Sequence, residues 1–350
     1  MHNLHPKTDQ LGMSLIELMV AMVLGLVLMA GVVQIFVVNS ASYDTNVGLA
    51  RLQETGRAAT ELIARKVRMA GYQGCVNMDK ITPAIISQSA APNLLFGPTD
   101  VLTGQNNVIA GNAFGALAGT DILTIRGASP IAAELAVNMA NDTDNVQLNG
   151  NPANFAANDV LFITDCAEAD IFTATGVAQG GGFTIVAHAN GANSSASLSK
   201  AYQSDAMVMA FDHGSYFVRD SGRNDERGNN INSLFWQNLN GVNNEVMEGV
   251  ENMQVFFGED TDGDGSVNRY VTANTAGLDF EQVIGVQVSL LVNSVQPATV
   301  QNDTSDYTLL DEVYDQATMP AAVPDLPYVR KVFSFTATSR NRELRSPTFN

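Results

Sequence analysis

The first regular feature of the chain is a long apolar run that passes into an amphipathic pattern without a break. Residues 18–38 contain no charged side chain, and Gln34 is the only strongly polar one among them. A helix of about 20 such residues is long enough to cross the apolar part of a bilayer. We therefore predict that residues 13–38 form the transmembrane half of a helix.

Residues 39–70 are predicted to continue this helix as an amphipathic half. Arginine and glutamate side chains occupy most of its surface, and the apolar positions recur at helical spacing. The side chains expected to share one face are Leu52, Ala59, Leu62, Ile63, Val67 and Ala70. Gly71 is predicted to end the helix. A helix over residues 14–70 is about 85 Å long at 1.5 Å per residue, so its second half is expected to pack on a domain outside the membrane.

From Gly74 onward, short apolar or alternating runs are separated by glycine, asparagine, aspartate and proline, which is typical of strands and turns. The predicted strands are Ile122–Arg126, Val160–Thr164, Ile171–Thr175, Phe183–Ala187, Met207–Asp212, Tyr216–Arg219, Val250–Phe257, Val283–Asn293 and Val332–Thr338. The residues Asp212-His213-Gly214-Ser215 predict a hairpin turn. Segments 128–157 and 189–199 are rich in asparagine, alanine and serine and are predicted to be surface insertions. The expected fold is α+β, with a long N-terminal helix packed on a β-rich headgroup over residues 71–350 that carries loop insertions.

Charge and composition narrow the classes of function. The chain has 350 residues and a net charge of −18, and only Lys7, Asp9 and Glu17 are charged within the first 38 residues. So acidic a headgroup would repel nucleic acid, and we predict no nucleic-acid contact. Beyond the first 12 residues the histidines are His188 and His213, and neither belongs to a recognisable catalytic motif. We therefore expect that the chain is not an enzyme.

An acidic loop is the candidate metal site. Oxygen-bearing side chains stand at every second residue, with Gly265 where a chain that wraps an ion must turn sharply: Asp260, Asp262, Asp264, Ser266 and Asn268. Such oxygens suit Ca²⁺, which prefers six to eight of them. The loop is not an EF-hand, because Val271 stands where the bidentate glutamate belongs. Further ligands are expected from Glu259, Asp279 or a neighbouring loop, and the alternative is an acidic turn without an ion.

The cysteines are Cys75 and Cys166, and neither has a second cysteine or a histidine at metal-ligand spacing. Two cysteines outside a membrane suggest one disulfide, and the alternative is two buried free thiols. In an oxidising compartment, a bridge that closes a loop of about 90 residues stabilises a fold by about 4 kcal/mol in the chain-entropy model.

Glu17 lies at the head of the apolar run, where a charge costs about 2.5–3.5 kcal/mol and calls for a partner. The run is too long for a secretory signal and lacks its exit site, so we expect it to be retained. Residues 12–18, Gly-Met-Ser-Leu-Ile-Glu-Leu, resemble the prepilin motif of type IV pilins and type II secretion pseudopilins. That resemblance implies cleavage of the leader 1–12 after Gly12, methylation of the new amino terminus of Met13, and Glu17 as the fifth mature residue.

Two features depart from the usual prepilin pattern. Met13 replaces the commoner phenylalanine, and Lys7 is balanced by Asp9, so the leader is less basic than most. The alternative to a prepilin is an uncleaved signal anchor in which Glu17 lies at the level of the lipid headgroups.

Four further stretches are similar to PilW-type minor pilins of type IV pilus systems. They are residues 68–75, 164–166 followed by 170–172, 249–255 and 339–342. The resemblance implies a long helix on a β-sheet headgroup, and a protein that helps other minor pilins to initiate the fibre of the major pilin near its tip. It also supports a bridge between Cys75 and Cys166. The implied location is the bacterial inner membrane, as a single-pass protein with a periplasmic headgroup that is processed by the prepilin peptidase and is a candidate for incorporation in the pilus.

The resemblance also implies a role for Glu17, because helices associate weakly in lipid by apolar contact alone. Its carboxylate is expected to neutralise the freed amino terminus of Met13 or of an adjacent subunit, which compensates two costly charges. The rival functions are a minor pseudopilin of a type II secretion system and a pilus-borne adhesin. The calcium-binding tip subunit of those secretion systems typically lacks the fifth-position glutamate. Glu17 therefore counts against the role of a type II secretion pseudopilin.

Overall fold

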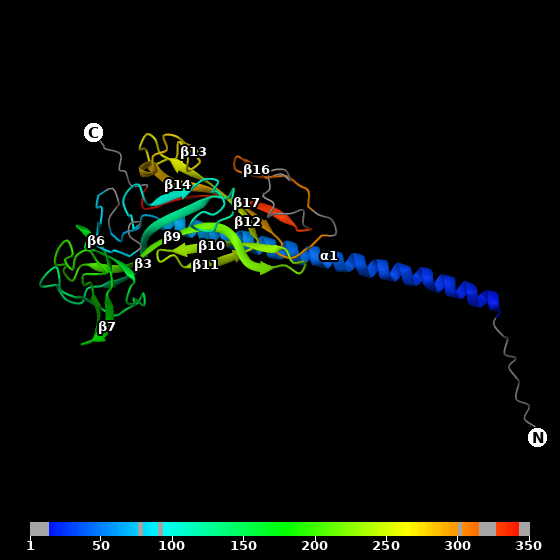
Figure 1. The fold of residues 1–350 in the computed structure, drawn as a ribbon, viewed down its shortest axis with the longest axis horizontal. Coiled ribbons are helices and arrows are strands. Elements are labelled where there is room, and N and C mark those ends of the chain that lie inside the picture. The colour runs from blue at the N-terminus through cyan, green and yellow to red at the C-terminus, as the bar shows by residue number, and fades with distance from the viewer. Residues whose placement is uncertain (1–13, 76–79, 90–93, 300–302, 315–326, 343–350) are drawn as a thin grey trace, which may run out of the picture.

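The computed structural model describes residues 14–75, 80–89, 94–299, 303–314 and 327–342. One long helix, α1, runs into a headgroup whose regular elements, among the described residues, are strands and one short 3-10 helix (Figure 1). This confirms the predicted α+β fold. Gly12, Met13 and the rest of the predicted leader lie outside the described residues.

The helix α1 spans Leu15–Met69, within one residue of the prediction at each end. Its N-cap is Ser14, whose hydroxyl accepts a hydrogen bond from the backbone N–H of Glu17 at 3.2 Å. It ends because Gly71 adopts a φ of 72°, which glycine reaches without strain. The N–H of Gly71 then donates to the carbonyl of Arg126 at 2.8 Å, which ties the end of the helix to the sheet.

The second half of α1 buries one face against the headgroup. Its buried residues are Gly48, Leu52, Gly56, Ala59, Ile63, Ala64 and Val67. They pack mainly on β17 (Arg330–Thr338) and β14 (Val283–Asn293). The predicted face is confirmed with one exception: Leu62 is 36% exposed, because it lies to the side of the stripe that contains Ala59 and Ile63.

The largest sheet has eight strands and includes the longest strand of the headgroup. Its strands are β1 (Ala84–Ile85), β2 (Leu102–Gln105), β3 (Ile122–Glu134), β5 (Val160–Thr164), β6 (Ala169–Thr173), β9 (Met207–Asn224), β10 (Asn230–Asn238) and β11 (Asn243–Glu248). The order is β1-β6-β5-β9-β10-β11, with β3 also on β9 and β2 beyond β3. Among the described strands of this sheet, β1 and β6 pair in parallel and the other pairs are antiparallel.

A four-stranded antiparallel sheet encloses the main core together with α1 and the largest sheet. Its order is β13-β12-β14-β17, with β12 at Val250–Glu259 and β13 at Arg269–Val271. The short 3-10 helix η1 (Phe280–Gln282) leads into β14. A two-stranded sheet of β15 (Tyr307–Leu309) and β16 (Glu312–Tyr314) packs near Leu291.

A three-stranded sheet covers a second core at the end of the headgroup opposite the free end of α1 (Figure 1). It consists of β4 (Val146–Leu148), β8 (Phe183–Ala187) and β7 (Gly176–Gly180) in that order. Segment 128–157 is therefore not a surface insertion as predicted. It carries the end of β3 and all of β4, and Leu135, Val146 and Phe155 are buried. In segment 189–199, Asn193 is buried and its amide bonds the backbone of Thr173.

The predicted hairpin at residues 212–215 is wrong, because these residues lie inside β9. A Cβ on Gly214 would lie 2.3 Å from the ring of Trp236 on the neighbouring strand β10. The glycine therefore permits close packing between strands and does not form a turn. The predicted bounds of β5, β8 and β14 are confirmed, whereas β10 and β11 were not predicted.

Candidate functional site

The first half of α1 stands clear of the headgroup (Figure 1). Every side chain from Ser14 to Ser40 is exposed. This segment has no buried residue and is long and apolar enough to cross a membrane. We call residues 14–40 the apolar arm.

Glu17 lies in the first turn of the apolar arm. A carboxylate there interacts favourably with the helix dipole, because the first N–H groups of a helix have no partner within it. The Ser14 hydroxyl satisfies one of these groups, that of Glu17 itself. Among the described residues, no side chain forms a hydrogen bond or an ion pair with the Glu17 carboxylate. One of its two predicted partners, the amine of Met13, lies outside those residues. The other is the amino terminus of an adjacent subunit.

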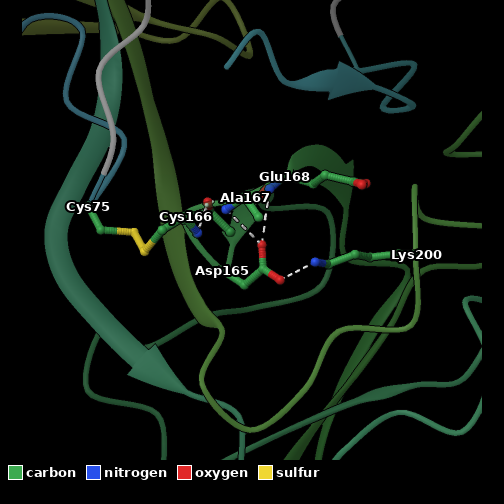
Figure 2. The surroundings of a disulfide bond; sticks show 7 residues. Cys75, Asp165, Cys166, Ala167, Glu168 and Lys200 are labelled. Atoms are coloured by element: carbon green, nitrogen blue, oxygen red, sulfur yellow. Dashed lines mark hydrogen bonds and ion pairs between the residues drawn. A yellow bond between two sulfur atoms is a disulfide. The ribbon is translucent and has the colours of Figure 1, made fainter. Parts of the chain in front are cut away.

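The structure joins Cys75 and Cys166 in a disulfide, with their Cα atoms 5.5 Å apart, which confirms the bridge (Figure 2). Cys75 follows the end of α1, and Cys166 lies in the turn between β5 and β6. The bridge therefore links the end of the helix to the part of the headgroup that contains the second core.

Hydrogen bonds hold the turn that carries Cys166. Its N–H donates to the hydroxyl of Thr164 at 3.1 Å, and the carboxylate of Asp165 accepts from the N–H groups of Ala167 and Glu168 at 3.1 and 3.0 Å. Asp165 also forms an ion pair with Lys200 (Figure 2). Burial alone would raise the pKa of Asp165, but the bonds from Lys200 and the two N–H groups outweigh it and lower that pKa.

The acidic loop brings three of its five predicted ligands together. Single carboxylate oxygens of Asp260, Asp262 and Asp264 lie within 4.8 Å of one another. Asp260 is buried and accepts from the N–H groups of Gly263 and Gly265 at 2.7 and 2.9 Å. Burial alone would raise its pKa, but these bonds lower it.

The remaining predicted ligands are placed differently. Asn268 accepts from the N–H of Thr261 at 2.6 Å and donates to Asp262 at 3.3 Å, while the N–H of Ser266 donates to Asp264 at 2.7 Å. Glu259 lies outside the three-carboxylate cluster, because its oxygens bind Arg269 and the N–H of Asp279. Three close carboxylates fit a hard cation such as Ca²⁺, and calcium stays a prediction.

The two headgroup histidines occupy buried or half-buried structural positions. The Nε2 atom of His188 lies 2.7 Å from the carbonyl oxygen of Asp144. Nδ1 of His213 accepts a hydrogen bond from Nε of Arg126 at 3.2 Å. Burial, which is the larger cause, and the positive charge of Arg126 together lower the pKa of His213 to about 3. His213 is therefore neutral at pH 7.

The buried ion pair between Arg330 and Glu251 was not predicted from the sequence. Nε of Arg330 lies 2.7 Å from Glu251, and its Nη1 lies 3.2 Å from Asp303. The side chains of Arg330 and Glu251 are only 1% and 3% exposed, so each charge depends on the other. The two residues are 79 positions apart, and the one local signal was a glutamate within the apolar strand pattern of β12.

Two family models match parts of the chain. Residues 215–341 match the model of type IV pilus-assembly protein W, and residues 7–33 match the prokaryotic N-terminal methylation motif. The first match covers β10–β17 together with the second half of β9, and the second covers the segment around Gly12, Met13 and Glu17. No curated protein matches the chain. The methylation motif and the apolar arm together indicate a membrane-anchored protein with a globular headgroup.

Proposed function

Because this chain is a PilW-type pilin with a prepilin-like N-terminus, we propose that it is a minor pilin that helps other minor pilins to initiate a type IV pilus. The observation that carries the proposal is the apolar arm with Glu17 at its head. Within the arm, residues 18–33 present a continuous exposed apolar surface that is unfavourable in water. Lipid covers this surface before assembly, and the helices of other subunits cover it in the fibre.

Glu17 sets the register of this association. Lipid is as apolar as the arm, so apolar contact alone does little to hold two helices in one alignment. The Glu17 carboxylate meets a positive amino terminus, its own or that of an adjacent subunit, and each charge compensates the other in a medium of low dielectric constant. The amine exists only after the leader is removed, so processing precedes assembly.

Processing follows from the same segment. The prepilin peptidase cleaves after Gly12 and methylates the amino terminus of Met13, while the chain remains anchored in the inner membrane with its headgroup in the periplasm. The match to the N-terminal methylation motif supports this sequence of events. The match of the headgroup to a pilus-assembly family favours the pilus over a type II secretion system.

The proposal is tested by isolating complexes from membranes that contain the full chain and the other minor pilins. Glu17→Ala is expected to be cleaved and inserted normally but to lose most of its co-purification with those pilins. Glu17→Asp, which keeps the charge, is expected to retain part of it. The matched control is Glu54→Ala, which removes an exposed carboxylate from the amphipathic half of the same helix.

Equal recovery of partner pilins with Glu17→Ala and with wild type would overturn the role of this carboxylate. Mass spectrometry of the same samples separates that outcome from a processing defect, because it reports whether residues 1–12 are absent and whether Met13 is methylated.

A further inference from the structure

Polar side chains form a row across one face of the largest sheet. Thr103 on β2 pairs with Thr124 on β3, Thr124 pairs with Ser215 on β9, and Ser215 pairs with Gln237 on β10. Residues directly opposite each other in a sheet point to the same face, so these four side chains lie side by side. The neighbouring row on the other face is apolar and aromatic, with Leu123, Tyr216 and Trp236.

Arg126 and His213 form the next pair on the polar face. Nη1 of Arg126 donates to the carbonyl of Asp100 at 2.5 Å and to the hydroxyl of Thr103 at 3.1 Å. Among the described residues, no carboxylate oxygen lies within 4.0 Å of its guanidinium nitrogens. Burial lowers the pKa of Arg126, and the charge of Asp100 offsets this only in part. A half-buried cation without a contacting counter-ion favours an anion.

The imidazole and hydroxyl groups around Arg126 also have protons available to donate to an acceptor. Nδ1 of His213 accepts from Arg126, so the neutral ring carries its proton on Nε2 and is a donor there. Oγ1 of Thr124 and Oγ of Ser215 are 2.7 Å apart and share one proton, which leaves the other hydroxyl proton for a further acceptor. The hydroxyl of Thr103 accepts from Arg126 and keeps its own proton to donate.

These groups line a cavity of about 660 Å³ whose other walls are amide and apolar side chains. This volume is within the range of about 300–1,000 Å³ that is typical of small-molecule sites. Gln105, Asn238 and Asn240 lie on the polar side, and Phe114 and Leu239 supply apolar surface. Amides both donate and accept, as sugar hydroxyls do, and a half-buried aromatic ring offers a surface for the apolar face of a sugar ring.

We propose that this cavity binds an acidic sugar, with the carboxylate on Arg126 and its neighbouring hydroxyl donors and the sugar hydroxyls on the amides. A simple anion would use Arg126 and leave the amide wall without a role. A neutral sugar would leave the guanidinium without a contacting counter-ion. This inference does not depend on the role of the chain in pilus initiation.

The test is calorimetric titration of the full chain in detergent at pH 7. The probes are D-glucuronate and D-galacturonate, with D-glucose and acetate as the comparison ligands. At least one sugar acid is expected to bind at least about tenfold more tightly than both glucose and acetate. Glucose lacks the carboxylate that bonds the charged Arg126, and acetate lacks the hydroxyls that contact the amides. Equal binding of acetate, or no saturation by either sugar acid at 10 mM, would overturn the proposal.

Variants locate the binding to this cavity. Arg126→Met is expected to weaken binding of the sugar acid at least about tenfold. Thr124→Val and Asn240→Ala are expected to weaken it by smaller factors, and they keep the proposal testable if Arg126→Met fails to fold. Arg219→Gln is the matched control, because it removes a positive charge from β9 where Arg219 lies over the ring of Phe235. Equal loss with Arg219→Gln and Arg126→Met would indicate a general charge effect and contradict the site.

Discussion

At Gly56 the backbone of α1 comes unusually close to the headgroup. A Cβ at this position would lie 2.3 Å from Cε2 of Phe333 on β17. Glycine inside a helix costs about 1 kcal/mol relative to alanine, so its presence needs a compensating contact. The approach of the helix to β17 supplies that contact.

Replacing Gly56 with alanine is therefore expected to lower the free energy of unfolding by about 1–3 kcal/mol, although alanine is the better helix former. Denaturant unfolding of the full chain in detergent measures the change. The control is Gly25→Ala in the apolar arm, where a new Cβ meets nothing within 4 Å. A Gly56→Ala variant as stable as wild type would show that the helix can move away from Phe333 at little cost.

His213 makes the stability depend on pH in a known direction. Its pKa is about 3 in the folded chain, against 6.5 for an ordinary histidine. Between these values the unfolded chain binds a proton that the folded chain does not, so the free energy of unfolding falls as the pH is lowered from about 6.5 to about 3. His213→Gln is expected to make this fall less steep in denaturation curves measured at several pH values. An unchanged slope would mean that other groups dominate in this range.

At the scale of elements, the sequence predicted those helices and strands whose own pattern of apolar and polar residues is clear. The helix α1 and strands β5, β8 and β14 follow from their own apolar spacing, and their bounds agree with the structure to within a residue. By contrast, β10 and β11 contain five asparagines, which obscure the alternation of apolar and polar residues in these strands. The strands β4 and β7, which pair with β8, were missed for a similar reason, because the core they help to cover consists of apolar residues scattered among small polar ones.

The candidate sites, too, could be predicted only where their residues form a local pattern along the chain. The disulfide and the acidic loop were predictable because a pair of cysteines and a run of alternating oxygens are visible along the chain. The pair Arg126–His213 is made by strand register, and Arg330 on β17 contacts Glu251 on β12 across the intervening strand β14, so neither pair was predictable from the sequence. The glycine of the supposed hairpin shows the ambiguity directly, since Gly214 is required by Trp236, a residue 22 positions away.

The disulfide is expected to contribute substantially to stability, because it closes a separation of 91 residues. Replacing both Cys75 and Cys166 with alanine is expected to lower the free energy of unfolding by about 4 kcal/mol in the chain-entropy model. Urea denaturation of the full chain in detergent measures this, and electrophoresis with and without reductant verifies that the bridge forms in the wild type. A loss below about 1 kcal/mol would mean that the unfolded chain is already restricted in this region.

The acidic loop predicts a response to calcium. Saturation of Asp260, Asp262 and Asp264 at a hundred times the dissociation constant would stabilise the fold by about 2.7 kcal/mol. The thermal midpoint of the full chain is expected to rise with Ca²⁺ and to fall again with chelator. The double variant Asp262→Asn, Asp264→Asn is expected to lose the response, while Asp205→Asn with Asp306→Asn, two exposed acids elsewhere, is expected to keep it. No shift in the wild type would refute the site.

For the whole molecule, the separation of parts agrees with a role in assembly. The apolar arm projects from one end, and the second core lies at the other end of the headgroup (Figure 1). The amphipathic half of α1 lies between them and is fixed to the headgroup by its buried face and, beyond its end, by the Cys75–Cys166 bridge. In the proposed fibre, contacts along the arm would position the headgroup to which the helix is fixed.

The most direct measurement is the number and the length of pili on cells whose only copy of this chain carries Glu17→Ala. If the chain helps to initiate the fibre through Glu17, the number of pili falls severalfold while the remaining pili keep their normal length. Cells with Glu54→Ala keep the wild-type number. A normal number of pili with Glu17→Ala, or pili that are equally numerous but shorter, would contradict the account.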